Sequence, residues 1–542
     1  MKTKVLLILI LLLVTVLRFW QLGDYPALNA DEASIGYDAY SLIQTGKDQH
    51  GNPWPISFQS FNDYKPGLLV YLVLPFVKTL GLNVWAVRVP GALAGVGTVL
   101  VLYLLVKQLK IGNWKLEIMA PALLVISPWH IHFSRGGWEV NVATFFITSG
   151  LLFFFKSLKN SKYLVVSCTL FVLSLYTYHA ARIITPLLVF GLLGIYSKEI
   201  FKNKKSLVVS AVIGLFLLMP LIKETSGGSF FSRVQGVGIF ADQGIISRIQ
   251  EQRGEHENHV GLPSIILHNK IVNYSLAFLE NWGKHFWGEF LFLSGDDIQR
   301  NRAPETGQLY LFQLIALVVG LWFMVKKLNK KFLVISYWLL VSPVAAALTF
   351  QSPHALRSQN MVIPLTIISA YGLLKFFDFI RYIFGKRILV LGVWCMVFGI
   401  VALESSRYLH MYWVHMAKEY PYSSQYGVKE LVAYVKEISG KFDRIIVTDR
   451  YDQPYVLFLF YLKYPPEKFQ NKHTLTSRDN FGFSTVREFA NFKFESIKFN
   501  ETRENYPNSL IIGTEEEIPE GVNVIKDIYG TNGFRYFRVV EN

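Results

Sequence analysis

The sequence is poor in cysteine, in charged residues and in nucleotide-binding motifs. Only two of its 542 residues are cysteines, Cys168 and Cys395, and both fall within apolar runs, so no disulfide framework is predicted. Charged residues make up 17% of the chain, less than in an average soluble domain. No Walker motif, dinucleotide fingerprint or zinc-protease motif occurs. The sequence therefore shows no sign of a disulfide-stapled secreted domain or of a nucleotide site.

Hydrophobic residues are abundant instead, at 52% of the chain. Apolar stretches recur along the first 404 residues, and each approaches the roughly 20 residues that a helix needs to cross a bilayer. We therefore predict a mainly α-helical, polytopic membrane protein. The first run follows Lys2 and Lys4 and lacks a signal-peptide cleavage site, so we interpret it as an uncleaved span. Eleven spans are expected, over residues 4–20, 86–106, 116–132, 140–155, 163–180, 182–197, 206–222, 308–325, 332–350, 360–377 and 388–404.

The distribution of positive charge predicts the orientation of these spans. The net charge is +15, and much of the excess lies in six short connections. By the positive-inside rule these connections are cytoplasmic, as is the N-terminus, and no nucleic-acid partner is needed to explain the charge. The apolar run 67–80 is too short to cross and is predicted to be an interfacial or re-entrant helix on the outer side. The six connections are Lys2–Lys4, Lys107–Lys115, Lys156–Lys162, Lys198–Lys205, Lys326–Lys331 and Arg381–Arg387.

This orientation divides the chain into a membrane domain, 1–404, and an extracytoplasmic soluble domain, 405–542. The membrane domain has two long outside loops, 21–85 and 223–307, and the part 223–262 is Gly-rich and polar, which is typical of a segment that is mobile or that orders on substrate binding. The soluble domain is expected to be α/β. Its elements are an apolar helical stripe from Val428 to Ile438, strands at 442–448 and 510–513, and a hairpin over 529–540 with Asn532–Gly533 as a two-residue turn.

Two acids follow the first predicted span. Asp31 and Glu32 lie in the first outside loop, beside the membrane surface. A carboxylate there is a candidate general base for an acceptor hydroxyl, with its neighbour orienting the base or the substrate. The alternative is a pair of solvated loop acids, since Asp24, Asp38 and Asp48 are also close in sequence.

Several cationic and polar residues on the outer side are candidates for binding a lipid phosphate. Lys65 can hold a phosphate as a point charge, and Tyr64 beside it can donate a hydrogen bond. Arg135 and Arg357, each on a short outside turn, carry the planar fork that suits phosphate. For each residue the alternative is an anchor at the membrane interface or, for Arg135, a cap of its turn.

Metal ligands are only weakly indicated. His130 and His132 form a His-x-His pair without clear carboxylate partners, and the segment 253–259, which ends in His259, fits a solvated loop better than a metal cluster. No metal site is assigned, and dependence on a divalent metal is left open.

With these residues in place, the chain resembles the membrane glycosyltransferases that use polyprenyl-phosphate sugars as donors. It is most similar to the bacterial branch related to the protein O-mannosyltransferases and to the aminoarabinose transferase of lipid A. The resemblance covers roughly residues 10–375, and it includes a Lys-Pro-Pro-Leu-like stretch in which Gly67 replaces the second proline. The matching stretches, in order, are Asn29–Ala33, Tyr64–Leu68, Arg88–Ala92, Ser127–Arg135 and Ser294–Tyr310.

The resemblance implies a GT-C-type helical bundle with an outward-facing cavity. It implies that Asp31 is the catalytic acid-base residue with Glu32 as its partner, and that Lys65 binds the donor phosphate. Arg357 is a weaker match, because the family's Arg-Tyr pair is Arg357-Ser358 in this chain.

The expected reaction is an inverting transfer of a hexosyl or pentosyl unit from a polyprenyl-phosphate donor to a hydroxyl, at the outer face of the cell membrane. The acceptor is a protein, a glycolipid or a cell-wall glycan, and membrane lipids surround the enzyme. The rival function is a lipid or sugar transporter or flippase, which would place ionisable residues near mid-membrane. A third is a polytopic receptor that binds through its outer domain.

Overall fold

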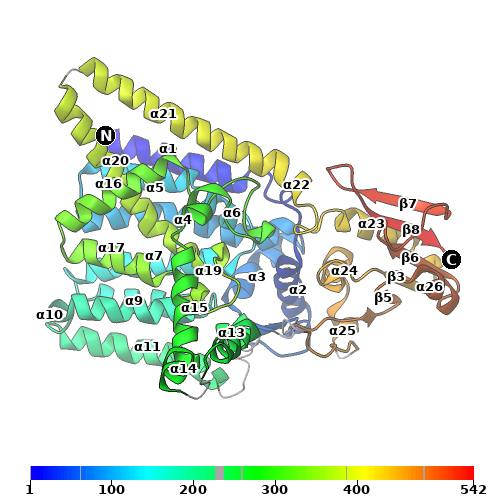
Figure 1. Cartoon of the computed structure of the whole chain (residues 1–542). Helices are drawn as coiled ribbons and strands as arrows, with labels where there is room; N and C mark the ends of the chain where they lie inside the picture. The colour runs from blue at the N-terminus through cyan, green and yellow to red at the C-terminus, as the bar shows by residue number, and fades with distance from the viewer. Residues whose placement is uncertain are drawn as a thin grey trace. The chain divides into compact units, whose positions relative to one another are not determined.

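The computed structural model (Figure 1) describes residues 2–61, 63–225, 237–257, 261–385, 387–470, 472–479 and 483–542. The chain folds into two compact units, each built from segments that are distant in sequence. Unit 1 contains residues 1–18, 93–134 and 139–408. Unit 2 contains residues 19–92, 135–138 and 409–542.

Unit 1 is helical. Six helices of the described residues are long and apolar enough to cross a membrane, and a seventh span results if α5 and α6, bent by 60° at Ser127, are joined. The helices are α1 (Lys2–Phe19), most of α4 (Val84–Leu109), α5 (Trp114–Ile126), α6 (Pro128–Ser134), α7 (Glu139–Ser157), α8 (Tyr163–Leu175), α9 (Ala181–Ile195), α10 (Ser197–Ile200), α11 (Lys204–Thr225), α13 (Gln243–Gly254), α14 (Leu262–Leu267), α15 (Lys270–Lys284), α16 (Phe312–Lys326), α17 (Lys330–Val341), α18 (Val344–Ala347), α19 (Ala355–Ser358), α20 (Val362–Phe384) and α21 (Arg387–His410).

Each of the eleven predicted spans coincides with helix, and the chain is a multi-pass membrane protein. The count of eleven stays a prediction, because α8, α9 and α16 have only 13 to 15 residues and α1 carries three cations. The orientation of the termini is likewise a prediction.

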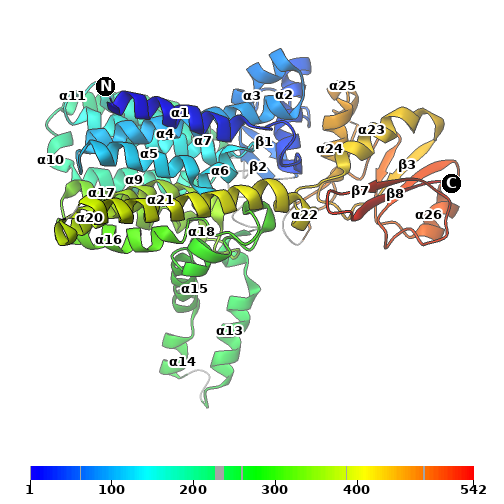
Figure 2. The ribbon, with the colours of Figure 1, turned by 90° about the horizontal axis from the view of Figure 1, so that it is seen from above.

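The region predicted as the second outside loop, residues 223–307, contains more helix than the sequence indicates. In Figure 2, α13, α14 and α15 extend away from the other helices of this unit. Ile245 and Ile249 of α13 pack against Tyr274 and Phe278 of α15, which joins the two helices side by side. Part of the predicted mobile segment, 226–236 and 258–260, lies outside the described residues, as does the candidate ligand His259.

Unit 2 combines the region predicted as the first outside loop, residues 21–85, with the C-terminal residues. The loop contributes α2 (Ala30–Thr45), the hairpin β1 (Ser57–Ser60) and β2 (Asp63–Pro66), α3 (Leu68–Leu80) and the start of α4. The C-terminal part contributes α22 (Met416–Glu419), α23 (Val428–Ile438), β3 (Arg444–Val447), α24 (Pro454–Leu462), α25 (Pro466–Phe469), β4 (Glu488–Phe489), β5 (Phe492–Phe494), α26 (Phe499–Asn505), β6 (Ser509–Gly513), β7 (Val524–Tyr529) and β8 (Arg535–Glu541).

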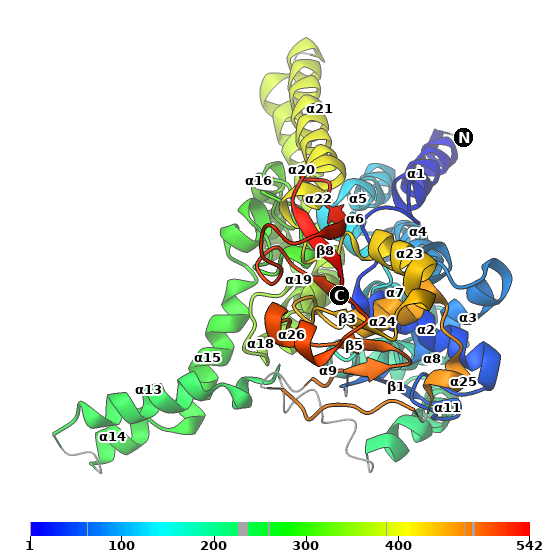
Figure 3. The same ribbon diagram turned by 90° about the vertical axis from the view of Figure 1, so that its right-hand side faces the viewer.

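The C-terminal strands form one six-stranded sheet of order β4-β5-β3-β6-β8-β7. Three of these strands, β3, β5 and β8, are labelled in Figure 3. Strands β5, β3 and β6 are parallel, and the outer pairs are antiparallel. Phe458 of α24 packs on Phe492 and Phe494 at one face, whereas Phe499 of α26 packs with Ile446 at the other. Helices therefore cover both faces, which is why the strands are apolar on both sides.

The predicted α/β elements of this region are present, with one correction. The helix and the strands β3 and β6 lie where the sequence predicts them, and β7 and β8 form the predicted hairpin. The prediction of a two-residue turn at Asn532–Gly533 is wrong. Three residues, 531–533, connect Gly530 and Phe534, whose backbone N–H and carbonyl are 2.7 Å apart (N···O). A glycine at the third position of such a loop is a common solution for a hairpin with a bulge.

Helix α2 is largely buried within unit 2. Its Gly36 lies so close to Phe460 of α24 that an added Cβ would be 2.6 Å from the phenyl ring. The Tyr37 hydroxyl donates to the Tyr464 carbonyl (2.9 Å), and the Gln470 amide donates to the Ser41 hydroxyl (2.9 Å). One face of α2 is therefore fixed by residues more than 400 positions later in the chain.

Candidate active site

The acidic pair lies in the first turn of α2 and not in a loop, which corrects the sequence prediction. Asn29 caps the helix: its side chain accepts from the Glu32 N–H (3.0 Å), and the Glu32 carboxylate accepts from the Asn29 N–H (3.3 Å). This reciprocal capping box satisfies two backbone donors at the helix start. The spacing of Asn29 and Glu32 is the sequence signal that predicts this helix, although the apolar pattern of the segment is weak.

Glu32 is held from several sides. Its two carboxylate oxygens accept from Nε and a terminal nitrogen of Arg88, at 2.7 Å each, and one of them also accepts from the Gly137 N–H (2.8 Å). Glu32 is 1% exposed and Arg88 is fully buried. Arg88 also donates to the carbonyls of Leu22 and Pro26. These donors hold the Glu32 carboxylate in one place, and Glu32 therefore fixes the position of the start of α2.

Asp31, the neighbouring acid, points to a partly open site. Its Oδ1 lies 2.5 Å from Nζ of Lys65, and the two side chains are 25% and 13% exposed. The two residues are 34 positions apart in sequence and are brought into contact by α2 and β2. The helix start carries partial positive charge, which further stabilises an ionised Asp31. The structure therefore brings together a carboxylate and an ammonium that remain accessible to a ligand.

Lys65 is fixed by the hairpin. It pairs with Phe58 across β1 and β2, and its ammonium lies 5.3 Å from the centre of the Phe61 ring. The Gly67 N–H donates to the Ile56 carbonyl (2.9 Å), and an added Cβ at Gly67 would be 2.5 Å from that oxygen. A proline at position 67 would have no N–H to donate to the Ile56 carbonyl, and its Cβ would clash with that oxygen. This explains why glycine replaces the second proline that the resembled family has after its lysine.

Behind this pair lies a buried polar network that the sequence did not reveal. Asp38, two turns along α2 from Asp31, accepts from the Gln49 backbone (3.0 Å) and side-chain amide (3.1 Å). The same amide donates to Ser34 (3.1 Å). Burial, with Asp48 nearby, raises the pKa of Asp38 well above its ordinary value, whereas Lys65 acts in the opposite direction. Asp38 is thus no solvated loop acid.

Arg135, the second phosphate candidate, is fully buried in unit 2. Its guanidinium donates to the carbonyls of Trp20 (2.6 Å) and Tyr25 (3.2 Å). It also lies over the rings of Tyr412 and Trp413, at 5.6 and 4.8 Å from their centres. These contacts resemble the turn-capping alternative, and a role in binding phosphate stays a prediction. Tyr64, beside Lys65 on β2, is partly exposed, and its role also stays a prediction.

Arg357 belongs to unit 1, on α19. Its guanidinium donates to the Thr349 hydroxyl (2.7 Å) and to the Gln351 side chain (3.4 Å). Asp296 supports the start of α19 by accepting from the Ala355 N–H (2.6 Å), and burial raises the pKa of Asp296. Arg357 is therefore held in a defined turn, and its role in binding phosphate is a prediction.

The two candidate metal ligands in unit 1 have other partners. His132 Nε2 lies 2.8 Å from the Arg300 carbonyl oxygen, and His130 Nδ1 lies 2.9 Å from a terminal nitrogen of Arg18. Within the described part of the chain, no group of three or more metal-ligating side chains converges.

Comparisons with known proteins give a result at the level of the fold. No family model matches the sequence, and no curated protein matches it. Among solved structures, ArnT from Cupriavidus metallidurans bound to undecaprenyl phosphate is similar over 98% of this chain and 97% of its own, with a TM-score of 0.55 and 11% identity. The Archaeoglobus fulgidus oligosaccharyltransferase in the apo form is similar over 94% of this chain and 69% of its own, with a TM-score of 0.52 and 13% identity.

This chain has the GT-C fold. The predicted fold class is confirmed: a mainly helical membrane protein of the GT-C type with a small C-terminal sheet. Because the coverage of ArnT is nearly complete in both directions, the likeness includes the C-terminal region as well as the membrane helices.

Proposed function

We propose that this GT-C protein is an inverting glycosyltransferase that moves a hexosyl or pentosyl unit from a polyprenyl-phosphate donor to an acceptor hydroxyl. The observation that carries the proposal is the 2.5 Å contact between Asp31 and Lys65 at the accessible start of α2. A carboxylate base and a cation side by side match the two charges of the reaction: the acceptor loses a proton, and the donor phosphate gains negative charge.

The proposed step is a single displacement. The acceptor oxygen attacks the anomeric carbon while its proton passes to Asp31. The bond from the anomeric carbon to the phosphate oxygen breaks, and its electron pair leaves with polyprenyl phosphate. Attack opposite to the leaving group inverts the anomeric centre. A positioned general base typically contributes on the order of 10²–10⁴-fold to the rate.

Lys65 is proposed to stabilise the leaving phosphate. For comparison, the removal of one preorganised hydrogen-bond donor from an oxyanion hole costs about 2.7–4 kcal/mol. Tyr64, Arg135 and Arg357 are proposed as further phosphate-binding residues, with Arg135 the least favoured because of its buried contacts. Glu32 is proposed to act through Asp31, by fixing the first turn of α2 against Arg88.

The structural neighbours support the donor class. ArnT of Cupriavidus metallidurans was solved with undecaprenyl phosphate, and AglB of Archaeoglobus fulgidus with dolichol-phosphate and an inhibitory peptide. A lipid-phosphate donor also agrees with a sequence that has no nucleotide motif. The proposed acceptor is a hydroxyl of a protein, a glycolipid or a cell-wall glycan at the outer face of the membrane.

The decisive experiment measures sugar transfer from a panel of radiolabelled polyprenyl-phosphate sugars in membranes that contain wild type, Asp31→Asn or Asp24→Asn. Asp24 is the matched control, because it is an acid of the same region whose side chain is 78% exposed. We expect transfer by wild type and by Asp24→Asn, and a loss of at least ~10²-fold for Asp31→Asn. Donor consumption that is unchanged by Asp31→Asn would refute the proposed base, and no consumption of any donor would favour the transporter.

A further inference from the structure

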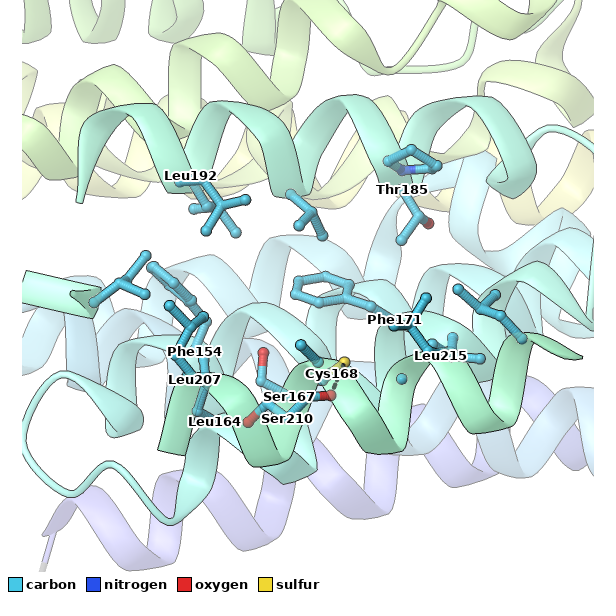
Figure 4. Close-up of a pocket in the computed structure, with 18 of the residues that line it drawn as sticks. Phe154, Leu164, Ser167, Cys168, Phe171, Thr185, Leu192, Leu207, Ser210 and Leu215 are labelled. Carbon is cyan, nitrogen blue, oxygen red and sulfur yellow. Dashed lines mark hydrogen bonds between the residues drawn. The ribbon is translucent and has the colours of Figure 1, made fainter. Parts of the chain in front are cut away.

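Helices α8, α9 and α11 of unit 1 enclose an apolar cavity of about 480 Å³ that the proposed reaction does not use (Figure 4). Leu164 and Leu207 lie at one end of it, and Thr185 and Leu215 lie toward the other. The cavity opens along α11, where Leu215 is 59% exposed. Pockets of this volume are large enough to bury most of a ligand of moderate size.

The few polar side chains that line the cavity are directed to partners in the protein. The Ser167 hydroxyl donates to the Gly150 carbonyl (2.8 Å), and the Cys168 thiol donates to the Ser210 carbonyl (3.3 Å). The Ser210 hydroxyl donates to the carbonyl of Ser206 (2.7 Å). Since these groups are already bonded, the cavity presents hydrocarbon and suits an apolar chain better than a polar ligand.

The length of the cavity matches one leaflet of a bilayer. On α8 the lining runs from Leu164 to Leu175, which corresponds to about 16 Å of helix. One leaflet is half of the roughly 30 Å hydrocarbon core, or about 15 Å. An acyl chain of a lipid in that leaflet would therefore fill the cavity from end to end.

The end near Leu164 carries a cluster of positive charge. Five exposed lysines lie in the connections there, and Lys162, Lys198 and Lys205 each precede a lining residue by two positions. The one acid of these connections, Glu199, lies 2.7 Å from Lys330. Basic clusters between membrane helices attract anionic headgroups. The cluster consists of Lys162, Lys198, Lys202, Lys204 and Lys205.

We propose that this cavity binds an anionic diacyl phospholipid, with one acyl chain between α8, α9 and α11 and the headgroup on the lysine cluster. Two observations together support the assignment. The apolar cavity is about as long as one leaflet, and excess positive charge lies at the end where the headgroup would be. Neither Asp31 nor Lys65 lines the cavity, and the proposal does not depend on glycosyl transfer.

The test is native mass spectrometry of the full chain in a neutral detergent, titrated with phosphatidylglycerol or with phosphatidylcholine of the same acyl chains. Two variants probe the site. Ala211→Phe fills the cavity from α11, and its control is Val212→Phe on the next, lipid-facing position. The triple variant Lys198→Gln, Lys202→Gln, Lys205→Gln removes much of the headgroup site, and its control is the same change at Lys107, Lys110 and Lys115.

We expect phosphatidylglycerol to bind at least tenfold more tightly than phosphatidylcholine. Each lysine near an anionic surface contributes roughly a fivefold gain, so the triple variant should lose on the order of tenfold to a hundredfold, and its control should lose little. Ala211→Phe should weaken phosphatidylglycerol binding, and Val212→Phe should not. The proposal would be overturned if a variant and its control lost affinity for phosphatidylglycerol equally. It would also be overturned if the lipid displaced by Ala211→Phe were undecaprenyl phosphate.

A second measurement leaves the cavity unaltered, so it tests the proposal even if Ala211→Phe misfolds. Cys395→Ser leaves Cys168, which lines the cavity, as the only thiol of the chain. In vesicles that contain phosphatidylglycerol, bound lipid should slow the reaction of Cys168 with methyl methanethiosulfonate several-fold relative to pure phosphatidylcholine vesicles. Equal rates in the two vesicles would contradict the site.

Discussion

Glu32 and Arg88 join the start of α2 to α4 through two parallel N–H···O contacts of 2.7 Å, and both side chains are shielded from solvent. The neighbouring Asp31 therefore projects from a helix end that cannot shift without breaking a buried ion pair. The two acids are adjacent in sequence but lie in different environments, because Glu32 is enclosed and Asp31 is partly exposed.

Glu32→Gln should destabilise the protein by about 3–5 kcal/mol, because it leaves the Arg88 charge buried without its counter-charge. Thermal or denaturant unfolding of the purified protein measures this loss. The exposed pair Glu516 and Arg450 supplies the control, and Glu516→Gln should change stability by less than about 1 kcal/mol. The double variant Glu32→Gln, Arg88→Met should recover part of the loss. A Glu32→Gln protein as stable as wild type would refute the positioning role.

Lys65→Gln should weaken binding of undecaprenyl phosphate by about tenfold to a hundredfold, since a hydrogen bond to a charged group contributes about 1.5–3 kcal/mol. Lys65→Arg should retain much of the affinity, because it keeps the charge. Lys47→Gln is the control, as Lys47 is an exposed lysine of the same unit. Binding of the labelled lipid to purified protein gives the affinities. If Lys65→Gln binds as tightly as wild type, the phosphate lies elsewhere.

Lowering the pH should destabilise unit 2, because His50 has a lower pKa in the folded protein than in the unfolded chain. Its Nδ1 lies 2.8 Å from Nε2 of His473, and burial, with this second ring nearby, lowers the pKa of His50 to about 3. Between pH 6.5 and about 3 the unfolded chain binds a proton at this residue that the folded chain does not, so stability falls as pH falls through this window. His50→Asn should show a smaller decrease in melting temperature over the same range. His415→Asn, at a side chain that is 38% exposed, is the control and should follow wild type.

The helical part of the fold was predictable because hydrophobic runs of the required length determine it. The site was predictable only in part. Asp31 and Lys65 stand out as charges beside apolar runs, and the structure brings them into contact. In the sequence Arg88 stands out only as part of a family-like stretch. Its pairing with Glu32 spans 56 positions, and no local pattern encodes a partner at that distance.

The sequence does not predict the Asp38 and Gln49 network, for a different reason. Asp38 lies among other acids in a polar segment, and it is buried in a helix that packs against α3, α24 and α25, which the sequence of the segment does not reveal. Similarly, the helical character of α2 is indicated by its capping box more than by its apolar pattern. Tertiary packing therefore decides the burial of Asp38, whereas Asn29 and Glu32 set the start of α2 locally.

The packing of α2 also orders events during synthesis. Asp31 leaves the ribosome with the first few dozen residues, but Phe460, Tyr464 and Gln470, against which its helix packs, are made more than 400 residues later. At translation rates of roughly 5–20 residues per second this delay is on the order of 20–80 seconds. During that time α2, which carries the proposed base, lacks the packing contacts that residues 460–470 supply. A nascent chain therefore completes the packing around α2 only after residues 460–470 have been made and folded against it.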